Sequence, residues 1–196
     1  MATPKLLAFA GSLRRDSLNK KLIKVAAEGA KNAGAEITYI DLKDYPLPIY
    51  DQDLEDESGI PENATKLKEL MKTHHGFLIA SPEYNGSVTA ALKNLIDWVS
   101  RPSPGEPPLG LVAFRDKTAV IMAASPGGLG GLRGLGQLRT ILEGLGVLVI
   151  PDQKAVPGAM KAFDENGQLV DADLQGAIAN LGAKLATITA KLSTEL

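Results

Sequence analysis

Four short apolar runs recur along the chain, each bounded by glycine, serine or proline, and this pattern is typical of strands buried on both faces of a sheet. A fifth run, Ile37–Asp41, is more polar but has similar length. We therefore predict five strands, the other four being Leu6–Ala10, Gly76–Ala80, Ala119–Ala123 and Val147–Ile150.

Segments with apolar residues at helical spacing separate these runs and follow the last one. In the first segment Leu22, Ile23, Ala26 and Ala30 fall on one stripe, which predicts a helix that packs on a core. Strands that alternate with helices of this length indicate right-handed crossovers. We predict an α/β fold with a doubly wound, five-stranded parallel sheet and helices on both faces. The predicted helices are Leu18–Ala33, Glu62–Thr73, Val88–Ser100, Leu132–Leu145 and about Asp171–Leu192.

Length and composition favour a single domain over residues 1–196. The 196 residues are 44% hydrophobic, which suffices for one sizeable core, and no shift in composition marks a linker. Two connections, Lys43–Pro61 and Arg101–Arg115, are longer than the usual two to about six residues and rich in proline. Long ordered loops often carry function. The pair Asn166-Gly167 predicts a hairpin, which we expect to cap the sheet edge after the fifth strand.

Charge and residue usage exclude several classes of function. The net charge of −2 implies no broad basic face for nucleic acid or an anionic membrane. Cysteine is absent, which removes disulfides, thiolate metal sites and thiol nucleophiles. His74-His75 has no third ligand at metal spacing, so we predict a structural role for the pair and no metal site. No apolar run approaches the roughly 20 residues of a membrane span, and no signal peptide precedes the first strand, so we expect a cytoplasmic protein.

The loop after the first strand, Gly11–Asn19, is rich in hydroxyl, amide and cationic side chains. It is neither a Walker loop, because no Gly-Lys dipeptide occurs, nor a dinucleotide G-x-G-x-x-G loop. Free N–H groups at a helix start attract anions, and the loop adds donors that suit a terminal phosphate: Ser12, Ser17, Asn19 and either Arg14 or Arg15. The alternative is that Ser17 merely caps the helix while the arginines are solvated, and this loop alone leaves the two interpretations evenly balanced.

Two further loops follow the third and fourth strands. Ser81–Ser87 contains Pro82 and Gly86, which fix an exposed turn whose main chain can face a ring edge, and Ser87 is the expected cap of the next helix. Ala124–Gly131 holds four glycines in five residues, which lets a flat ligand lie against the backbone, although a flexible connector is the alternative. In doubly wound sheets ligands bind at the carboxyl ends of the strands where the strand order reverses, so these loops are expected to be neighbours.

The motifs in these loops resemble those of the NADPH-dependent FMN reductase family, whose relatives include quinone, chromate and azo-dye reductases. The resemblance rests on Gly11-Ser12-Leu13-Arg14-x-x-Ser17-x-Asn19, on Pro82-Glu83-Tyr84-Asn85-Gly86-Ser87, and on the helix that begins Ala90-Ala91-Leu92-Lys93-Asn94. It implies a flavodoxin-like fold, an FMN cofactor, NADPH or NADH as cosubstrate, and a homodimer or homotetramer. By position, it implies that the FMN phosphate is held by Ser12, Arg14, Ser17 and Asn19, and that the isoalloxazine is lined by Pro82, Glu83, Tyr84, Asn85, Gly86, Ser125 and Gly127.

The expected function is an FMN-dependent NAD(P)H oxidoreductase. Hydride would pass from nicotinamide to flavin N5, and two electrons would then pass to a quinone-like or other small acceptor such as a flavin, azo dye or metal oxyanion. The flavin carries the chemistry, so no side chain is assigned a catalytic role. We expect Glu83 to be a solvent-facing or capping carboxylate rather than a general acid, Trp98 to belong to the core or a subunit interface, and Arg101 to contact an anionic acceptor or the NADPH phosphate.

Two other functions remain open at this point. A flavodoxin-type electron carrier would exchange electrons with a protein partner, but such carriers are usually strongly acidic, whereas this chain is nearly neutral. A regulatory or structural domain with a vestigial loop would bind no flavin. A yellow purified protein would eliminate that third alternative.

Overall fold

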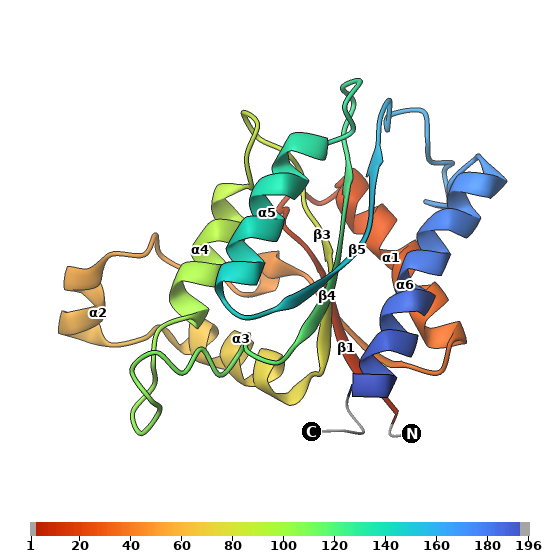
Figure 1. The fold of residues 1–196 in the computed structure, drawn as a ribbon. Coiled ribbons are helices and arrows are strands. Elements are labelled where there is room, and N and C mark those ends of the chain that lie inside the picture. The colour runs from red at the N-terminus through yellow and green to blue at the C-terminus, as the bar shows by residue number, and fades with distance from the viewer. Residues whose placement is uncertain (1–2, 193–196) are drawn as a thin grey trace.

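A computed structural model describes residues 3–192 and shows one five-stranded parallel sheet (Figure 1). The strand order is β2-β1-β3-β4-β5, so the order reverses between β1 and β3. This is the flavodoxin-like arrangement, and it confirms the predicted fold class. The strands are β1 Lys5–Ala10, β2 Glu36–Ile40, β3 Gly76–Ala80, β4 Thr118–Ala124 and β5 Leu148–Val156.

Helices cover both faces of the sheet (Figure 1). Side chains alternate along β1, so that Leu6 and Ala8 join a core with two of the helices, whereas Leu7 and Phe9 join a second core on the other face. One face carries α1 Leu18–Asn32 and α6 Ala172–Leu192, and the other carries α3 Glu62–Thr73, α4 Ala90–Val99 and α5 Leu132–Gly144. Among residues 3–192 no helix has the length and apolarity required to cross a membrane.

Helices α1 and α6 pack unusually close together at two glycines. A Cβ atom on Gly29 would lie 2.0 Å from the carbonyl oxygen of Ala179, and one on Gly182 would lie 1.9 Å from that of Ala26. Any side chain at either position would force the helices apart. This contact fixes α1 against α6 and with it the loop that precedes α1.

The structure differs from the sequence predictions in two connections. The long connection Lys43–Pro61 contains a helix, α2 Gln52–Ser58, which projects from the body of the protein (Figure 1). Helix α2 buries no residue, so it has no apolar stripe from which it could be predicted. The Asn166-Gly167 pair does form a turn, closed by a bridge between Phe163 and Leu169. The turn contacts α1, where Lys21 lies over the Phe163 ring, and the expectation that it caps the edge after β5 is wrong.

Candidate functional site

The loops that follow β1, β3 and β4 come together at the carboxyl edge of the sheet, at the top of Figure 1. They enclose a pocket of about 120 Å³. The pocket brings together all the residues that we expected to contact FMN except Asn85, Gly86 and Gly127. Its lining residues are Ser12, Arg14, Ser17, Leu18, Asn19, Pro82, Glu83, Tyr84, Ala124, Ser125 and Pro126.

Helix α1 begins at this pocket without a side-chain cap. Ser17 occupies the N-cap position with extended backbone, but its hydroxyl makes no capping hydrogen bond. Within residues 3–192 the backbone N–H groups of Leu18 and Asn19 have no hydrogen-bond acceptor. Ser17 therefore does not serve as the ordinary cap that the sequence left open. The hydroxyl of this mostly buried residue and the two free N–H groups lie where an anion could accept hydrogen bonds from them.

The two other helices that follow these loops, α4 and α5, each have a side-chain cap. At α4, Thr89 rather than the expected Ser87 is the cap: its hydroxyl oxygen accepts from the N–H of Leu92 and donates to the carbonyl of Gly11 at 2.6 Å. At α5, the carboxylate of Glu83 accepts from the N–H of Gly134 at 3.0 Å. Within residues 3–192, of the three helices that follow these loops, α1 alone starts without a side-chain acceptor for its N–H groups.

Asn19 clamps the start of α1 to the end of β4. Its side-chain N–H donates to the carbonyl of Ala124, and its side-chain oxygen accepts from the N–H of the same residue, both at 2.9 Å. The side chain is almost fully buried. The resemblance assigns Asn19 to the phosphate, whereas these contacts make it a residue that positions the loops after β1 and β4 relative to each other.

The loop after β3 ends in a two-residue turn. Asn85 and Gly86 have φ values of 53° and 79°, and Tyr84 and Ser87 exchange two backbone hydrogen bonds of 3.0 and 3.1 Å across them. This is the geometry for which Asn-Gly is the favoured sequence. The N–H groups of Asn85 and Gly86 have no acceptor within residues 3–192, so the turn presents free main-chain donors beside the pocket.

The glycines after β4 divide into two pairs. Gly130 and Gly131 have φ values of 63° and 95°, and a Cβ atom on either would come within 2.8 Å of the backbone at Val156 or the side chain of Ala123. These two glycines are required by the fold itself. A Cβ atom on Gly128 would meet nothing within 4 Å and one on Gly127 only the hydroxyl of Ser125 at 3.7 Å, so of the four glycines these two leave room for a flat ligand against the backbone.

Glu83 is held as a carboxylate. The N–H of Gly134 is the largest influence that lowers its pKa, and Arg133 lowers the pKa further through an ion pair with a nitrogen–oxygen distance of 2.6 Å. A carboxyl group in this state is a poor proton donor at neutral pH. The contacts agree with the expected capping role of Glu83 and speak against general acid catalysis. The sequence analysis predicted neither Arg133 as the partner of Glu83 nor Thr89 as the cap of α4, for which it named Ser87.

Arg101 lies away from this pocket, contrary to our expectation. Helix α4 starts at the pocket and carries the chain about 15 Å toward the opposite edge of the sheet before Arg101 follows. The guanidinium pairs with Glu55 at 2.7 Å and lies over the ring of Tyr50. Trp98 is fully buried and donates to the carbonyl of Pro48, which confirms the core alternative for this residue.

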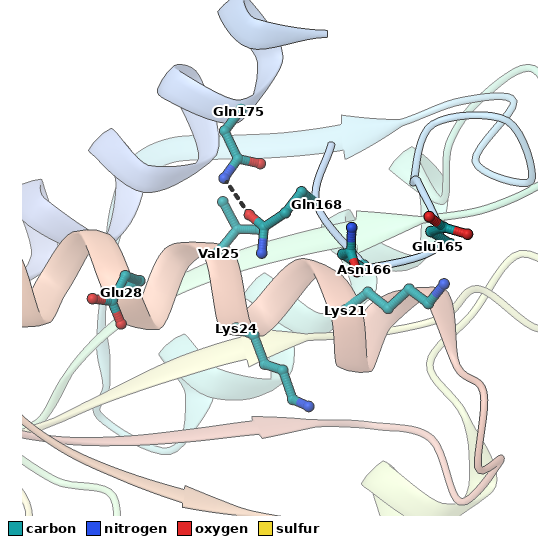
Figure 2. Close-up of a pocket in the computed structure, with 9 residues that line it drawn as sticks. Lys21, Lys24, Val25, Glu28, Glu165, Asn166, Gln168 and Gln175 are labelled. Atoms are coloured by element: carbon teal, nitrogen blue, oxygen red, sulfur yellow. Dashed lines mark hydrogen bonds between the residues drawn. The ribbon is translucent and has the colours of Figure 1, made fainter. Parts of the chain in front are cut away.

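A larger hollow of about 470 Å³ lies elsewhere, between α1 and the turn around Asn166 (Figure 2). Its lysines, Lys21 and Lys24, come from α1, and two of its amides bond to each other, Gln175 donating to Gln168 at 2.9 Å (Figure 2). It contains no residue of the three loops. Size alone therefore does not select the candidate site, and the free N–H groups and hydroxyls favour the smaller pocket.

The sequence of residues 4–161 matches the model of a known family, described as NADPH-dependent FMN reductase. The chain is 34% identical over 181 residues to a probable NADPH:quinone oxidoreductase 2 of Oryza sativa subsp. japonica, with 88% of this chain and 84% of the relative covered. It is 32% identical to the quinone reductase of Escherichia coli strain K12, with 92% and 91% covered. Among solved structures, the flavoenzyme NAD(P)H:(acceptor) oxidoreductase FerB from Paracoccus denitrificans matches with a TM-score of 0.79 and 26% identity, covering 96% of this chain and 98% of that one.

Proposed function

Because the chain belongs to the NADPH-dependent FMN reductase family and is therefore an oxidoreductase that uses FMN with NAD(P)H, we propose that it reduces quinone-like or other small acceptors at the pocket described above. The observation that carries this proposal is that α1 starts without a side-chain cap, whereas α4 and α5, which follow the neighbouring loops, each have one. A phosphate monoester is the part of FMN that suits such a terminus.

The phosphate of FMN would lie against the first turn of α1. The N–H groups of Leu18 and Asn19 and the hydroxyl of Ser17 are its proposed donors, and Ser12 lines the same pocket. Arg14 lines this pocket and makes no ion pair within the described part of the chain, so its charge is available for an anion. Asn19 would contribute by holding the loop in shape through Ala124 rather than chiefly by a direct contact.

The flavin ring would lie between the turn at Asn85-Gly86 and the loop that contains Ser125 and Gly127. FMN, when bound, would supply the redox chemistry, in which a hydride from nicotinamide is accepted at N5 and two electrons go to the acceptor. The chain itself would orient the ring and present main-chain N–H groups to the ring edge, where they favour added negative charge. Pro82 and Tyr84 line the pocket on this side, and Tyr84 remains 57% exposed.

The acceptor range in this proposal covers quinones, flavins, azo dyes and metal oxyanions, with NADPH or NADH as the reductant. No acidic side chain is needed as a proton donor, since Glu83 is held ionised by its partners. The net charge of −2 supports an enzyme over a flavodoxin-type carrier, which would dock to a protein partner through a strongly acidic surface.

The test is anaerobic mixing of the FMN-loaded protein with NADPH and, separately, with NADH. We expect the flavin absorbance to bleach with at least one nucleotide and to recover when a quinone is added. Bleaching followed by recovery supports the enzyme. A protein that binds FMN but is bleached by neither nucleotide would be an electron carrier, and a colourless protein that ignores added FMN would overturn the site itself.

Two further parts of the proposal concern the protein as a whole. The resemblance supports a homodimer or homotetramer, and so do exposed apolar side chains in the two long connections, where Ile49 is 86% and Leu109 is 81% exposed. Sedimentation of the purified protein tests this state, and a monomer at micromolar concentration contradicts it. A cytoplasmic location is proposed with it and can be tested by cell fractionation.

A further inference from the structure

Glu83 lies on the loop after β3, but its carboxylate is directed away from that loop and into the start of α5. One carboxylate oxygen accepts from the N–H of Gly134 at 3.0 Å, and the other accepts from the side-chain Nε of Arg133 at 2.8 Å. The side chain is only 8% exposed. Helix α5 has no cap of its own, because Gly131 occupies its N-cap position. The helix thus takes its cap from another loop.

A glycine, Gly134, allows the close packing around this contact. A Cβ atom on Gly134 would lie 3.2 Å from Cβ of Glu83 and 3.2 Å from the carbonyl oxygen of Ser87. Glycine within a helix costs about 1 kcal/mol relative to alanine. Here it permits the loop after β3 to approach α5 directly, so that the turn at Asn85-Gly86 is held against a rigid helix.

The charge of Glu83 would by itself oppose reduction of a flavin in the adjacent pocket, because reduction adds negative charge nearby. Arg133 carries the opposite charge and pairs with Glu83 at 2.6 Å. Its side chain is 64% exposed, so it contributes little to the core, and its contact with Glu83 accounts for its orientation. The start of α5 adds partial positive charge on the same side.

We propose that Glu83 is a positioning residue that holds the ring-facing turn against α5, and that Arg133 balances its charge so that the bound flavin remains easily reduced. The proposal rests on the proposed function, since it requires FMN in this pocket. It gives the pair two separable effects. Glu83 affects both the shape of the turn and the potential of the flavin, whereas Arg133 acts chiefly on the potential.

The test compares Glu83→Gln, Arg133→Gln and the double variant with the wild-type protein. FMN affinity is measured by fluorescence quenching, and the midpoint potential of bound FMN by spectroelectrochemical titration. We expect Arg133→Gln to make the potential more negative and Glu83→Gln to make it more positive, with the double variant close to wild type. Glu83→Gln should also weaken FMN binding by about tenfold, because the charged hydrogen bond that shapes the turn is replaced by a weaker, neutral one.

Opposite shifts in potential distinguish this proposal from a purely structural role, which would move both single variants in the same direction. The matched control is Glu143→Gln, because Glu143 is an exposed carboxylate near the other end of α5 and should leave affinity and potential unchanged. Shifts of the same sign, or no shift in Arg133→Gln, would overturn the inference, and the second result decides it even if Glu83→Gln does not fold. Wild-type protein that fails to bind FMN would instead overturn the proposed function.

Discussion

Helices α1 and α5 begin at the same edge of the sheet, but a side chain caps only α5. At α5, Glu83 from a neighbouring loop accepts from the N–H of Gly134 and offsets the positive end of the helix. At α1, Ser17 makes no capping bond although serine is among the best caps. An unused cap costs a protein about 1 kcal/mol, so this difference supports our proposal that the start of α1 receives an anionic ligand, whereas that of α5 is part of the scaffold.

The largest expected effect comes from closing α1 in the way that α5 is closed. Ser17→Asp would place a carboxylate at the N-cap, where it can accept from the free N–H groups and stabilise the ligand-free protein by about 1 kcal/mol. The same carboxylate would repel a phosphate, since two unit charges about 4 Å apart interact by about 4 kcal/mol near a protein surface. We expect FMN affinity to fall more than about 100-fold while the thermal midpoint of the ligand-free protein rises.

The neutral variant Ser17→Ala separates the effect of the added carboxylate charge on FMN binding from the effect of losing the hydroxyl. It should weaken FMN binding by only about tenfold, the value of one hydrogen bond to a charged group. Fluorescence titration with FMN and thermal unfolding measure the two quantities. A Ser17→Asp protein that binds FMN as well as the wild type would show that the phosphate lies elsewhere.

The second prediction concerns the clamp that gives the open terminus its shape. Asn19→Ala would leave both the N–H and the carbonyl of Ala124 buried without partners, and we expect a loss of about 2 to 3 kcal/mol in the free energy of unfolding. FMN affinity should fall as well, because α1 and the loop after β4 are no longer held together. Asn32→Ala, at the exposed far end of the same helix, is the matched control and should change neither urea unfolding nor FMN binding. Equal stability of the two variants would contradict the clamp.

The third prediction sharpens the same comparison within the loop that leads into α5. Gly130→Ala should destabilise the protein by about 1 to 3 kcal/mol, since Gly130 has a positive φ and its Cβ would meet the backbone at Val156. Gly127→Ala should leave the free energy of unfolding almost unchanged, because the nearest atom to its Cβ would be 3.7 Å away, but it should weaken FMN binding. Urea unfolding and FMN titration of the two variants provide the check. The reverse pattern would mean that the open pair of glycines is structural.

The fold could be predicted from the sequence because apolar residues recur along it with the regular spacing of strands and helices. Apolar runs and apolar helical stripes predicted four of the five strands and the five packed helices to within a few residues. The predictions Gly76–Ala80 and Glu62–Thr73 are correct at both ends. The fifth, β5, continues past Pro151 to Val156 into a stretch with no apolar pattern. Helix α2 was missed for the same physical reason, since all its side chains face solvent or are only partly covered.

The pocket could be predicted in outline, but the partner of each side chain could not. Motif positions placed Ser12, Ser17 and Ser125 correctly at one edge, because parallel strands bring their carboxyl ends together. The identity of a hydrogen-bond partner is a tertiary property: nothing near Asn19 in the sequence indicates Ala124, and nothing near Glu83 indicates Gly134. Arg101 was misplaced because its distance from the pocket depends on the length and direction of α4.

The smallest expected effect is a dependence of stability on pH that arises from the cap of α5 by Glu83. The N–H of Gly134 and the charge of Arg133 hold the pKa of Glu83 below its ordinary value of 4.5. A carboxyl group whose pKa is lower in the folded state stabilises the protein above pH 4.5 and loses this contribution as the pH falls through the folded-state value. The thermal midpoint of the ligand-free wild type should therefore exceed that of Glu83→Gln at pH 7, and the difference should shrink toward pH 3. Glu143→Gln should follow the wild type throughout, whereas a constant difference for Glu83→Gln would mean that the cap acts through shape rather than charge.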